Sequence, residues 1–339
     1  MAASNTPLKT EKKRGIRRGR GIAFRFSAWI LLSATLIFGL VFGYYYELSR
    51  GLLVANIEQY ARQLAQGTAG RIDRILAATE KIPENLSLFI AEADSRDKLE
   101  SYVRKILERN ADVYGSAVAF EPHAWKPGIP HFSPYLHKEK GTILAALIPY
   151  DYFTWDWYRV PRELNRPVWT EPYFDEGAGN IVMSTYSVPF YREVKGEKRF
   201  QGIVTVDISL EWLRHIVSNI KIGKTGYAFL ISQKGAFVTH PNPGLIMNDS
   251  IFKLAENRRD PVLHLIGDEM TAGRSGFIQN DSLMDGRSCW LAYTPLASNG
   301  WSLGLVFPQD ELMADVTSHY RQALSLGALG LLFICRVIV

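Results

Sequence analysis

The longest uninterrupted hydrophobic segment lies close to the N-terminus. Residues 27–46 (SAWILLSATLIFGLVFGYYY) contain no charged side chain, and about twenty such residues match the thickness of a hydrocarbon core at helical rise. The segment ends in three tyrosines, as membrane helices often end in aromatic residues at the water interface. The pattern predicts a transmembrane helix over 27–46. A cleaved signal peptide is the competing interpretation, but the run is long and no small-residue cleavage site follows it.

A helical pattern follows directly. Between Glu47 and about Lys81, side chains on one stripe recur every three or four residues, which predicts one long amphipathic helix. The stripe consists of Leu53, Ile57, Tyr60, Leu64, Thr68, Ile72, Ile75 and Thr79. Pro83 is expected to end or kink this helix, because proline lacks a backbone N–H and clashes with the preceding turn. Shorter helices are expected at 85–92 and 95–110.

The middle of the chain changes to short segments typical of an antiparallel sheet. Strands are expected at 114–120, 143–150, 168–174, 181–191 and 200–208. A loop is expected at 121–138. Its three histidines match no zinc pattern, so we expect no metal. Short helices are expected at 157–165 and 211–220.

A second, smaller module with the same plan begins near residue 223. Its strands are expected at 227–232, 236–240, 276–280, 287–294 and 301–306, with helical segments between 250 and 270. Residues 308–325 are helical and lead into an apolar run, 323–339, interrupted by Arg336. We interpret this run as a second membrane helix that is incomplete, and expect the native protein to continue beyond it.

These elements predict an α+β chain with a membrane helix and a long helix, then two antiparallel-sheet modules, then a second membrane helix. The expected divisions are a basic tail (1–26), the first transmembrane helix (27–46), a stalk helix with further helices (47–112), a membrane-distal module (113–221), a membrane-proximal module (222–312) and a helix leading into the second transmembrane helix (313–339).

Charge is concentrated at the N-terminus. The net charge of the chain is +5, yet residues 1–26 alone contain eight Lys or Arg and one Glu. A nucleic-acid-binding arm is one interpretation of such a segment. The adjacent membrane helix supplies another, since positive charge collects on the cytoplasmic side of a membrane. We therefore expect a cytoplasmic N-terminus, membrane association and no nucleic-acid partner.

Aromatic and acidic residues crowd the stretch between residues 150 and 207. Asp151, Asp156 and Asp175 lie among aromatic side chains, and Asp207 follows in an otherwise apolar strand. Aromatic faces attract cations and carboxylates pair with ammonium groups, so the pattern predicts a pocket for an organic cation. The alternative is that the aromatics fill a core and the carboxylates face water.

Catalytic motifs are missing from the sequence. It contains no GxGxxG before a helix, no P-loop, no HExxH and no GxSxG. Glu171 and Asp175 are imaginable as a glycosidase pair, but carboxylates so placed on a strand more often pair with cations. We expect no catalysis and no cofactor. Two alternatives stay open: a membrane-anchored extracytoplasmic enzyme, which predicts an open cleft with an acid–base pair, and an adhesion domain, which predicts no convergence of these residues.

Local sequence adds a family resemblance to this layout. The stretch GKTGYAFLI at 223–231, followed by Gly235 and His240-Pro241, resembles the opening of the proximal module in double Cache sensor domains. Pro189 and GIVTVDIS at 202–209 resemble the closing strands of the distal module. The resemblance covers about residues 47–313.

This resemblance implies two PAS-like modules and a sensor outside the cytoplasm. It places the chain in a bacterial inner (plasma) membrane, with the sensor domain periplasmic or extracellular. It also implies a homodimer with the long helices side by side. The output is expected in a phosphatase, kinase, cyclase or chemotaxis signalling module, and the sequence does not select among these.

One branch of the family binds α-amino acids in the distal module, and most of its motif is present. The matching positions are Tyr150, Trp157, Tyr158, Tyr173, Asp175 and Asp207. The family's tyrosine and aspartate side chains hold the ligand ammonium, while an arginine, helped by the tryptophan, holds the carboxylate. Trp155 occupies the arginine position in this sequence.

Replacing that arginine by Trp155 removes a bidentate clamp and adds an aromatic face. The primary hypothesis is therefore a ligand without an α-carboxylate, namely an organic amine or quaternary ammonium. The alternative is an amino acid whose carboxylate is held by Arg159, Arg162 or Arg166. A third interpretation is a pocket that has lost its ligand and transmits stress or a binding-protein contact.

Overall fold

The computed structural model describes residues 21–90, 92–284 and 286–338, so most of the expected basic tail lies outside the described residues. The first element is one continuous helix, α1 (Ile22–Ile90). It passes through Pro83, so the expectation that the helix ends there is wrong. Leu86 and Ile90, on the turns after the proline, are 6% and 0% exposed. Their burial offsets the roughly 3 kcal/mol that an interior proline costs a helix.

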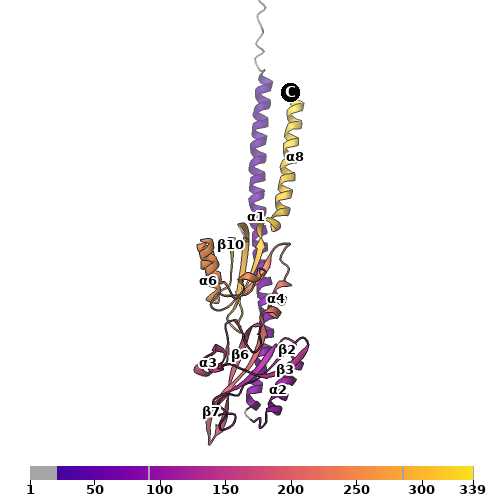
Figure 1. Cartoon of the computed structure of the whole chain (residues 1–339). Coiled ribbons are helices and arrows are strands. Elements are labelled where there is room, and N and C mark those ends of the chain that lie inside the picture. The colour runs from indigo at the N-terminus through magenta and orange to yellow at the C-terminus, as the bar shows by residue number, and fades with distance from the viewer. Residues whose placement is uncertain (1–20, 91, 285, 339) are drawn as a thin grey trace, which may run out of the picture. The chain divides into compact units, whose positions relative to one another are not determined.

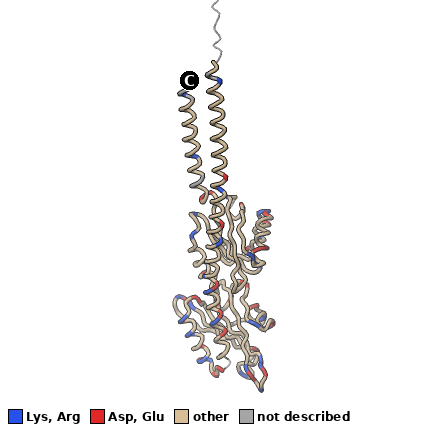
Figure 2. The backbone as a smooth tube through the Cα atoms, turned by 180° about the vertical axis from the view of Figure 1, so that it is seen from behind, with Lys and Arg blue, Asp and Glu red and all other residues tan. Residues whose placement is uncertain are grey.

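The N-terminal part of α1 carries the apolar segment. Figure 2 shows the helix free of charged residues between Arg25 and Glu47. Among the described residues, α1 is the one helix long and apolar enough to cross a membrane. The expected second span falls in the C-terminal helix α8 (Ala314–Ile338), and the described residues do not show this helix as a span.

The buried stripe of α1 differs in detail from the expected one. Ile57, Ile72 and Thr79 are buried as expected, but Tyr60 is 56% exposed. The stripe is completed by Ala61, Ala65, Ala69 and Leu76. Alanine carries little hydrophobic signal in a sequence pattern, yet its small side chain lets the helix backbone come close to its neighbours.

The distal module contains a seven-stranded antiparallel sheet in the order β3-β2-β1-β7-β6-β4, with β5 also paired to β6. Its strands are β1 (Gly115–Phe120), β2 (Pro134–Glu139), β3 (Thr142–Leu147), β4 (Val168–Trp169), β5 (Tyr173–Phe174), β6 (Val182–Val194) and β7 (Glu197–Ser209). Strand β2 lies in the segment expected to be a loop, and the single strand expected at 168–174 is split into β4 and β5. Both are corrections: Pro134 and the charged end of β2 hide a strand that is buried over its first four residues.

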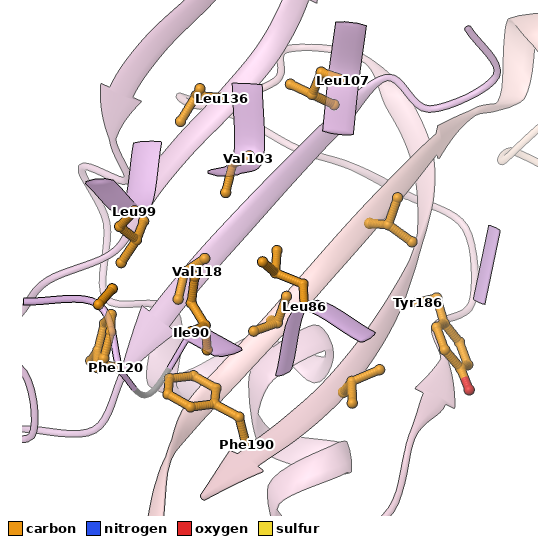
Figure 3. Close-up of a cluster of buried hydrophobic side chains, with 14 of the residues drawn as sticks. Leu86, Ile90, Leu99, Val103, Leu107, Val118, Phe120, Leu136, Tyr186 and Phe190 are labelled. Carbon is orange, nitrogen blue, oxygen red and sulfur yellow. The ribbon is translucent and has the colours of Figure 1, made fainter. Parts of the chain in front are cut away.

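One face of this sheet packs on helices and the other on an aromatic segment. Figure 3 shows the helical side, where Leu99, Val103 and Leu107 of α2 (Arg96–Arg109) meet Val118 and Phe120 of β1. On the opposite side lie η1 (Tyr152–Thr154) and α3 (Asp156–Leu164). Their aromatic side chains pack on Ala119 and Ile203. Figure 1 shows the positions of α2 and α3 beside the sheet.

Helix α4 (Leu210–Ser218) leads into the proximal module. This module has a five-stranded antiparallel sheet in the order β10-β11-β12-β8-β9. The remaining elements are β8 (Tyr227–Ile231), β9 (Phe237–Thr239), η2 (Pro243–Leu245), α5 (Ile251–Arg258), α6 (Pro261–Thr271), β10 (Gly276–Met284), β11 (Arg287–Pro295), β12 (Ser302–Pro308) and α7 (Gln309–Leu312). The α+β plan of a long helix and two antiparallel-sheet modules is therefore confirmed.

Helix α1 is tied to the proximal module by one carboxylate. Asp73 of α1 accepts hydrogen bonds from the backbone N–H groups of Ala297 (2.9 Å) and Ser298 (3.0 Å). The Ser298 hydroxyl donates to the same carboxylate over 3.0 Å. The turn between β11 and β12 is thereby fixed to the side of the helix.

Candidate ligand-binding site

The floor of the candidate site is the sheet face of the distal module opposite α1 and α2. Along this face, β1 contributes the small residues Gly115 and Ala117. Gly115 pairs with Asp207 of β7, and Asp207 pairs with Thr185 of β6, so these three residues lie side by side. Strand alternation places their side chains on the same face. A carboxylate is thus set beside a strand position that has no side chain.

Asp207 ends a chain of hydrogen bonds. The Thr185 hydroxyl donates to Asp207 Oδ1 over 2.8 Å, and Tyr173 OH lies 2.7 Å from Thr185 Oγ1. Since threonine has one hydroxyl proton, Tyr173 is the donor in the second bond. Asp207 is 3% exposed, so its carboxylate is held by neutral hydroxyls within the protein.

Asp175 supplies a second buried carboxylate. Tyr150 OH donates to its Oδ1 over 2.6 Å, and the backbone N–H of Gly179 donates to its Oδ2 over 2.6 Å. The turn after β5 therefore wraps around the carboxylate. A Cβ atom at Gly179 would lie 3.0 Å from both Asp175 Oδ2 and Tyr135 OH, so the close approach requires glycine.

The two carboxylates affect each other electrostatically. Burial, with a smaller contribution from the charge of Asp175, raises the pKa of Asp207 to about 7, although the hydrogen bond from Thr185 opposes the rise. Burial also raises the pKa of Tyr150 and Tyr173, so both phenols are neutral donors. The cluster carries negative charge that water does not screen, which favours a cation beside it.

Trp155 packs on the two tyrosines that belong to this acidic cluster. Its ring stacks on Tyr150 with centroids 4.7 Å apart and meets the Tyr173 ring edge-on at 5.8 Å. The position precedes α3 and serves as its N-cap, without a side-chain hydrogen bond to the helix. Trp155, the residue that replaces the arginine of the amino-acid motif, therefore belongs to the aromatic cluster next to the carboxylates.

Trp157 and Tyr158 occupy the aromatic cluster with Tyr152, Ala119 and Ile203. Trp157 is 3% exposed and lies close enough to the Tyr150 hydroxyl to lower its pKa. Tyr158 OH donates to Glu121 over 2.7 Å instead of to either aspartate. The structure thus brings Tyr150, Trp155, Tyr173, Asp175 and Asp207 together, with Trp157 beside them and the Tyr158 hydroxyl turned to Glu121.

Two of the three arginines considered as substitute cations form ion pairs with other residues. Arg159 pairs with Asp156 at 2.7 Å, and Arg162 pairs with Glu121 at 2.9 Å. Arg166 is exposed. Asp151, noted in the sequence among the carboxylates, is exposed and caps η1.

Sequence reasoning missed Thr185, Tyr135 and Gly179 as parts of this site. The alternation of β6 was a usable signal for Thr185, since it places a hydroxyl on the face of Asp207. No comparable signal existed for Tyr135, because β2 was expected to be a loop. Cavities of about 540 and 300 Å³ lie elsewhere, the larger between α1 and α2 and the smaller between α1 and the residues that follow α2.

Two family models match consecutive parts of the chain. Residues 99–215 match the first PDC sensor domain of methyl-accepting chemotaxis protein-like sequences, and residues 202–321 match the Cache 3/Cache 2 fusion domain. The chain is also 25% identical over 313 residues to the methyl-accepting chemotaxis protein McpG of Pseudomonas putida, covering 89% of this chain and 43% of McpG. The chain therefore spans less than half the length of such relatives.

Solved structures show the same fold. The extracellular domain of mmHK1S-Z3, assigned as a histidine kinase, is 28% identical, with a TM-score of 0.68 over 77% of this chain and 97% of that domain. The ligand-binding domain of PctB, an amino acid chemoreceptor of Pseudomonas aeruginosa solved with L-Gln, is 20% identical. Its TM-score is 0.55 over 80% of this chain and 98% of that domain.

The fold and these matches define an extracytoplasmic, ligand-sensing region of a membrane receptor, a class that carries no catalytic machinery in its sensor. Over residues 99–321 the chain carries a sensor domain of the double Cache family, similar to the matched regions of McpG and of mmHK1S-Z3. The resemblance inferred from sequence is confirmed at the level of this family.

Proposed function

We propose that the distal module binds a small organic amine in its protonated form. The observation that carries the proposal is the pair of buried carboxylates, Asp175 and Asp207, in one cluster of aromatic hydroxyls. Among the described residues, neither aspartate forms an ion pair. A ligand ammonium would supply the missing positive charge.

The aromatic side chains support the same ligand class. Trp155, Tyr150 and Tyr173 surround the carboxylates with ring faces and edges, and ring faces attract ammonium groups by about 0.5–2 kcal/mol. A ligand carboxylate buried here would cost several kcal/mol without a cationic partner. Trp155 supplies none, and Arg159 and Arg162 are paired with other residues.

An α-amino acid is the second candidate. It is favoured by the shared fold with the L-Gln-bound domain of PctB. Binding an α-amino acid through Arg159 or Arg162 would require that arginine to leave Asp156 or Glu121, a cost that an amine does not incur. Binding through Arg166 would require this exposed side chain to become ordered at the site.

The proposed context is a receptor with two membrane helices. The divisions are the tail 1–26, membrane helix 27–46, helices 47–112, distal module 113–221, proximal module 222–312 and output helix 313–339. The N-terminus would be cytoplasmic in a bacterial inner membrane, α8 would supply the second span, and two copies would pair along their long helices. Reporter fusions at residues 20 and 339 test the topology, because both ends should report a cytoplasmic location.

The ligand class is tested by thermal unfolding of the full chain in detergent. Probes are alkylamines, quaternary ammoniums, L-amino acids and simple carboxylates. A ligand at one hundred times its Kd stabilises the folded state by about 2.7 kcal/mol. Stabilisation by amines should vanish in Asp207→Asn and persist in Glu176→Gln, which changes an exposed carboxylate next to Asp175. Stabilisation by carboxylates alone would refute the proposal.

A further inference from the structure

The same sheet face carries an unusual group of unsatisfied polar atoms. Among the described residues, six buried side-chain nitrogen or oxygen atoms have no hydrogen-bond partner. Four of them belong to this face: Ser133 Oγ, Tyr135 OH, His137 Nδ1 and Ser187 Oγ. An unpaired buried polar group costs about 1–3 kcal/mol, so such a cluster requires an explanation.

Strand register shows that the four residues share one face. His137 pairs with Gly115, and Gly115 pairs with Asp207. Tyr135 pairs with Ala117 one step along, and Ser187 pairs with Thr205. Ser133 continues the alternation of β2 by two residues. The unpaired atoms therefore surround the small residues of β1 that form the floor of the site.

Tyr135 reaches the acidic end of this floor. Its hydroxyl lies 2.4 Å from where a Cβ atom at Gly115 would be, and 3.0 Å from where one at Gly179 would be. It is 2% exposed. The hydroxyl interacts with Asp207 closely enough to lower the pKa of that carboxyl, and it has no other hydrogen-bond partner. An N–H group placed between the two aspartates would give Tyr135 a partner.

Ser187 lies two residues beyond Thr185 on the same side of β6. Consecutive side chains on one face of a strand are about 6.5–7 Å apart. Ser187 and Ser133 offer hydroxyls, and burial lowers the pKa of His137 so that its imidazole is neutral. The second end of the floor is therefore polar and uncharged.

We infer that the ligand is a primary ammonium compound carrying a second, uncharged hydrogen-bonding group, with Tyr135 at its nitrogen and Ser187 at its other end. This inference rests on the proposed amine-binding function and narrows it. A quaternary ammonium has no N–H donors to satisfy Tyr135, and a simple alkylamine has nothing to offer Ser187.

Three matched probes separate these requirements: ethanolamine, ethylamine, which lacks the hydroxyl, and choline, in which the nitrogen is trimethylated. Their affinities are measured by titration calorimetry on the full chain in lipid nanodiscs. Ethanolamine should bind about tenfold more tightly than either analogue, as expected for one lost hydrogen bond. Equal or tighter binding of choline or ethylamine would overturn the inference.

Substitutions test the two residues separately. Tyr135→Phe should weaken ethanolamine about tenfold and leave choline unchanged, while Ser187→Ala should reduce ethanolamine to the affinity of ethylamine. The Ser187 hydroxyl has no partner to lose, so Ser187→Ala should unfold no earlier than the parent chain. Tyr135→Phe also removes the interaction that lowers the pKa of Asp207, so its unchanged binding of choline serves as the check that the site remains folded. Tyr186→Phe is the matched control, because its hydroxyl bonds Glu84 on the opposite face. It should bind all three probes normally.

The outcomes distinguish failure of this inference from failure of the proposed amine-binding function. If amines bind, Asp207→Asn abolishes their binding, and Tyr135→Phe and Ser187→Ala behave like the parent chain, the inference is wrong and the amine site stands. If no amine binds, both are wrong.

Discussion

Thr185 and Asp207 face each other across β6 and β7, and the threonine hydroxyl donates a 2.8 Å hydrogen bond to the aspartate. This bond stabilises the carboxylate, but burial and the charge of Asp175 outweigh it and raise the pKa of Asp207 to about 7. The side chain consequently titrates in the physiological range, at a position where most aspartates stay ionised.

The raised pKa predicts a pH-dependent stability. The folded-state pKa lies above the unfolded value of about 4, so Asp207 contributes fully below pH 4 and its contribution is lost as the pH rises through 7. Asp207→Asn should therefore stabilise the chain at pH 8 by on the order of 2–4 kcal/mol and have little effect at pH 4. Denaturant unfolding at both pH values measures this. Equal effects at the two pH values would contradict it.

Ligand binding should show the opposite dependence on pH. An ammonium ligand pairs with ionised Asp207, so amine affinity should rise between pH 6 and pH 8 and binding should release a proton below pH 7. Calorimetric titrations in buffers of different ionisation enthalpy count the released protons. Proton uptake, or no exchange of protons at pH 6, would refute the assignment of Asp207 to the ammonium.

A single substitution at Trp155 should change the class of ligand that the site binds. Trp155→Arg would place a guanidinium above Tyr150 and Tyr173, beside the acidic cluster. Because such a group can hold a carboxylate, the variant should be stabilised by L-glutamine in thermal unfolding, whereas the parent chain should not. Trp155→Leu is the control: it should lose amine binding without gaining the amino acid. No response of Trp155→Arg to any L-amino acid would contradict the prediction.

The hydrogen bonds of Asp73 should make a measurable contribution to the free energy of unfolding, because they attach α1 to the proximal module. Asp73→Ala removes three hydrogen bonds to Ala297 and Ser298, and should destabilise the chain by about 2 kcal/mol. Amides of the turn between β11 and β12 should exchange faster with deuterium. Asp94→Ala provides the comparison, since its exposed pair with Lys98 at 3.8 Å should contribute less than about 0.5 kcal/mol. Similar losses in the two variants would argue against a specific attachment at Asp73.

The Trp169 indole N–H donates a 2.7 Å hydrogen bond to Glu80 of α1. Burial raises the pKa of Glu80, and this bond opposes the rise. Trp169→Phe should therefore raise that pKa further and destabilise the chain by about 1–2 kcal/mol at pH 8, with a smaller loss at pH 4. A double-mutant cycle with Glu80→Gln should give a coupling near 1 kcal/mol at pH 8. Strict additivity would show that the bond contributes nothing.

Much of the fold was predictable because most elements carry a clear period. The long helix, α2 and the strands β6 and β7 follow from repeated apolar positions. The sequence pattern failed where tertiary packing decides: Pro83 stays helical because Leu86 and Ile90 are buried, and β2 forms despite Pro134 and its charged end because its first four residues are enclosed.

The residues of the site could be predicted where they match the motif of the amino-acid-binding branch. Tyr150, Tyr173, Asp175 and Asp207 come together around two carboxylates. Tyr158 could not be placed from sequence, because the partner of its hydroxyl, Glu121, is 37 residues away. Tyr135 could not be predicted for a different reason: it lies on β2, a segment whose sequence pattern indicated a loop.

Strand β6 places Thr185 and Tyr186, two adjacent residues, on opposite sides of the sheet. Thr185 bonds Asp207, while Tyr186 bonds Glu84 of α1. Any coupling between these two bonds must be reciprocal: if an occupied site alters the free energy of the Tyr186–Glu84 bond, then whatever restrains α1 alters ligand affinity by the same factor. Under the proposed topology, a restraint on the cytoplasmic end of α1 would therefore change the extracytoplasmic ligand concentration at which the site is half occupied.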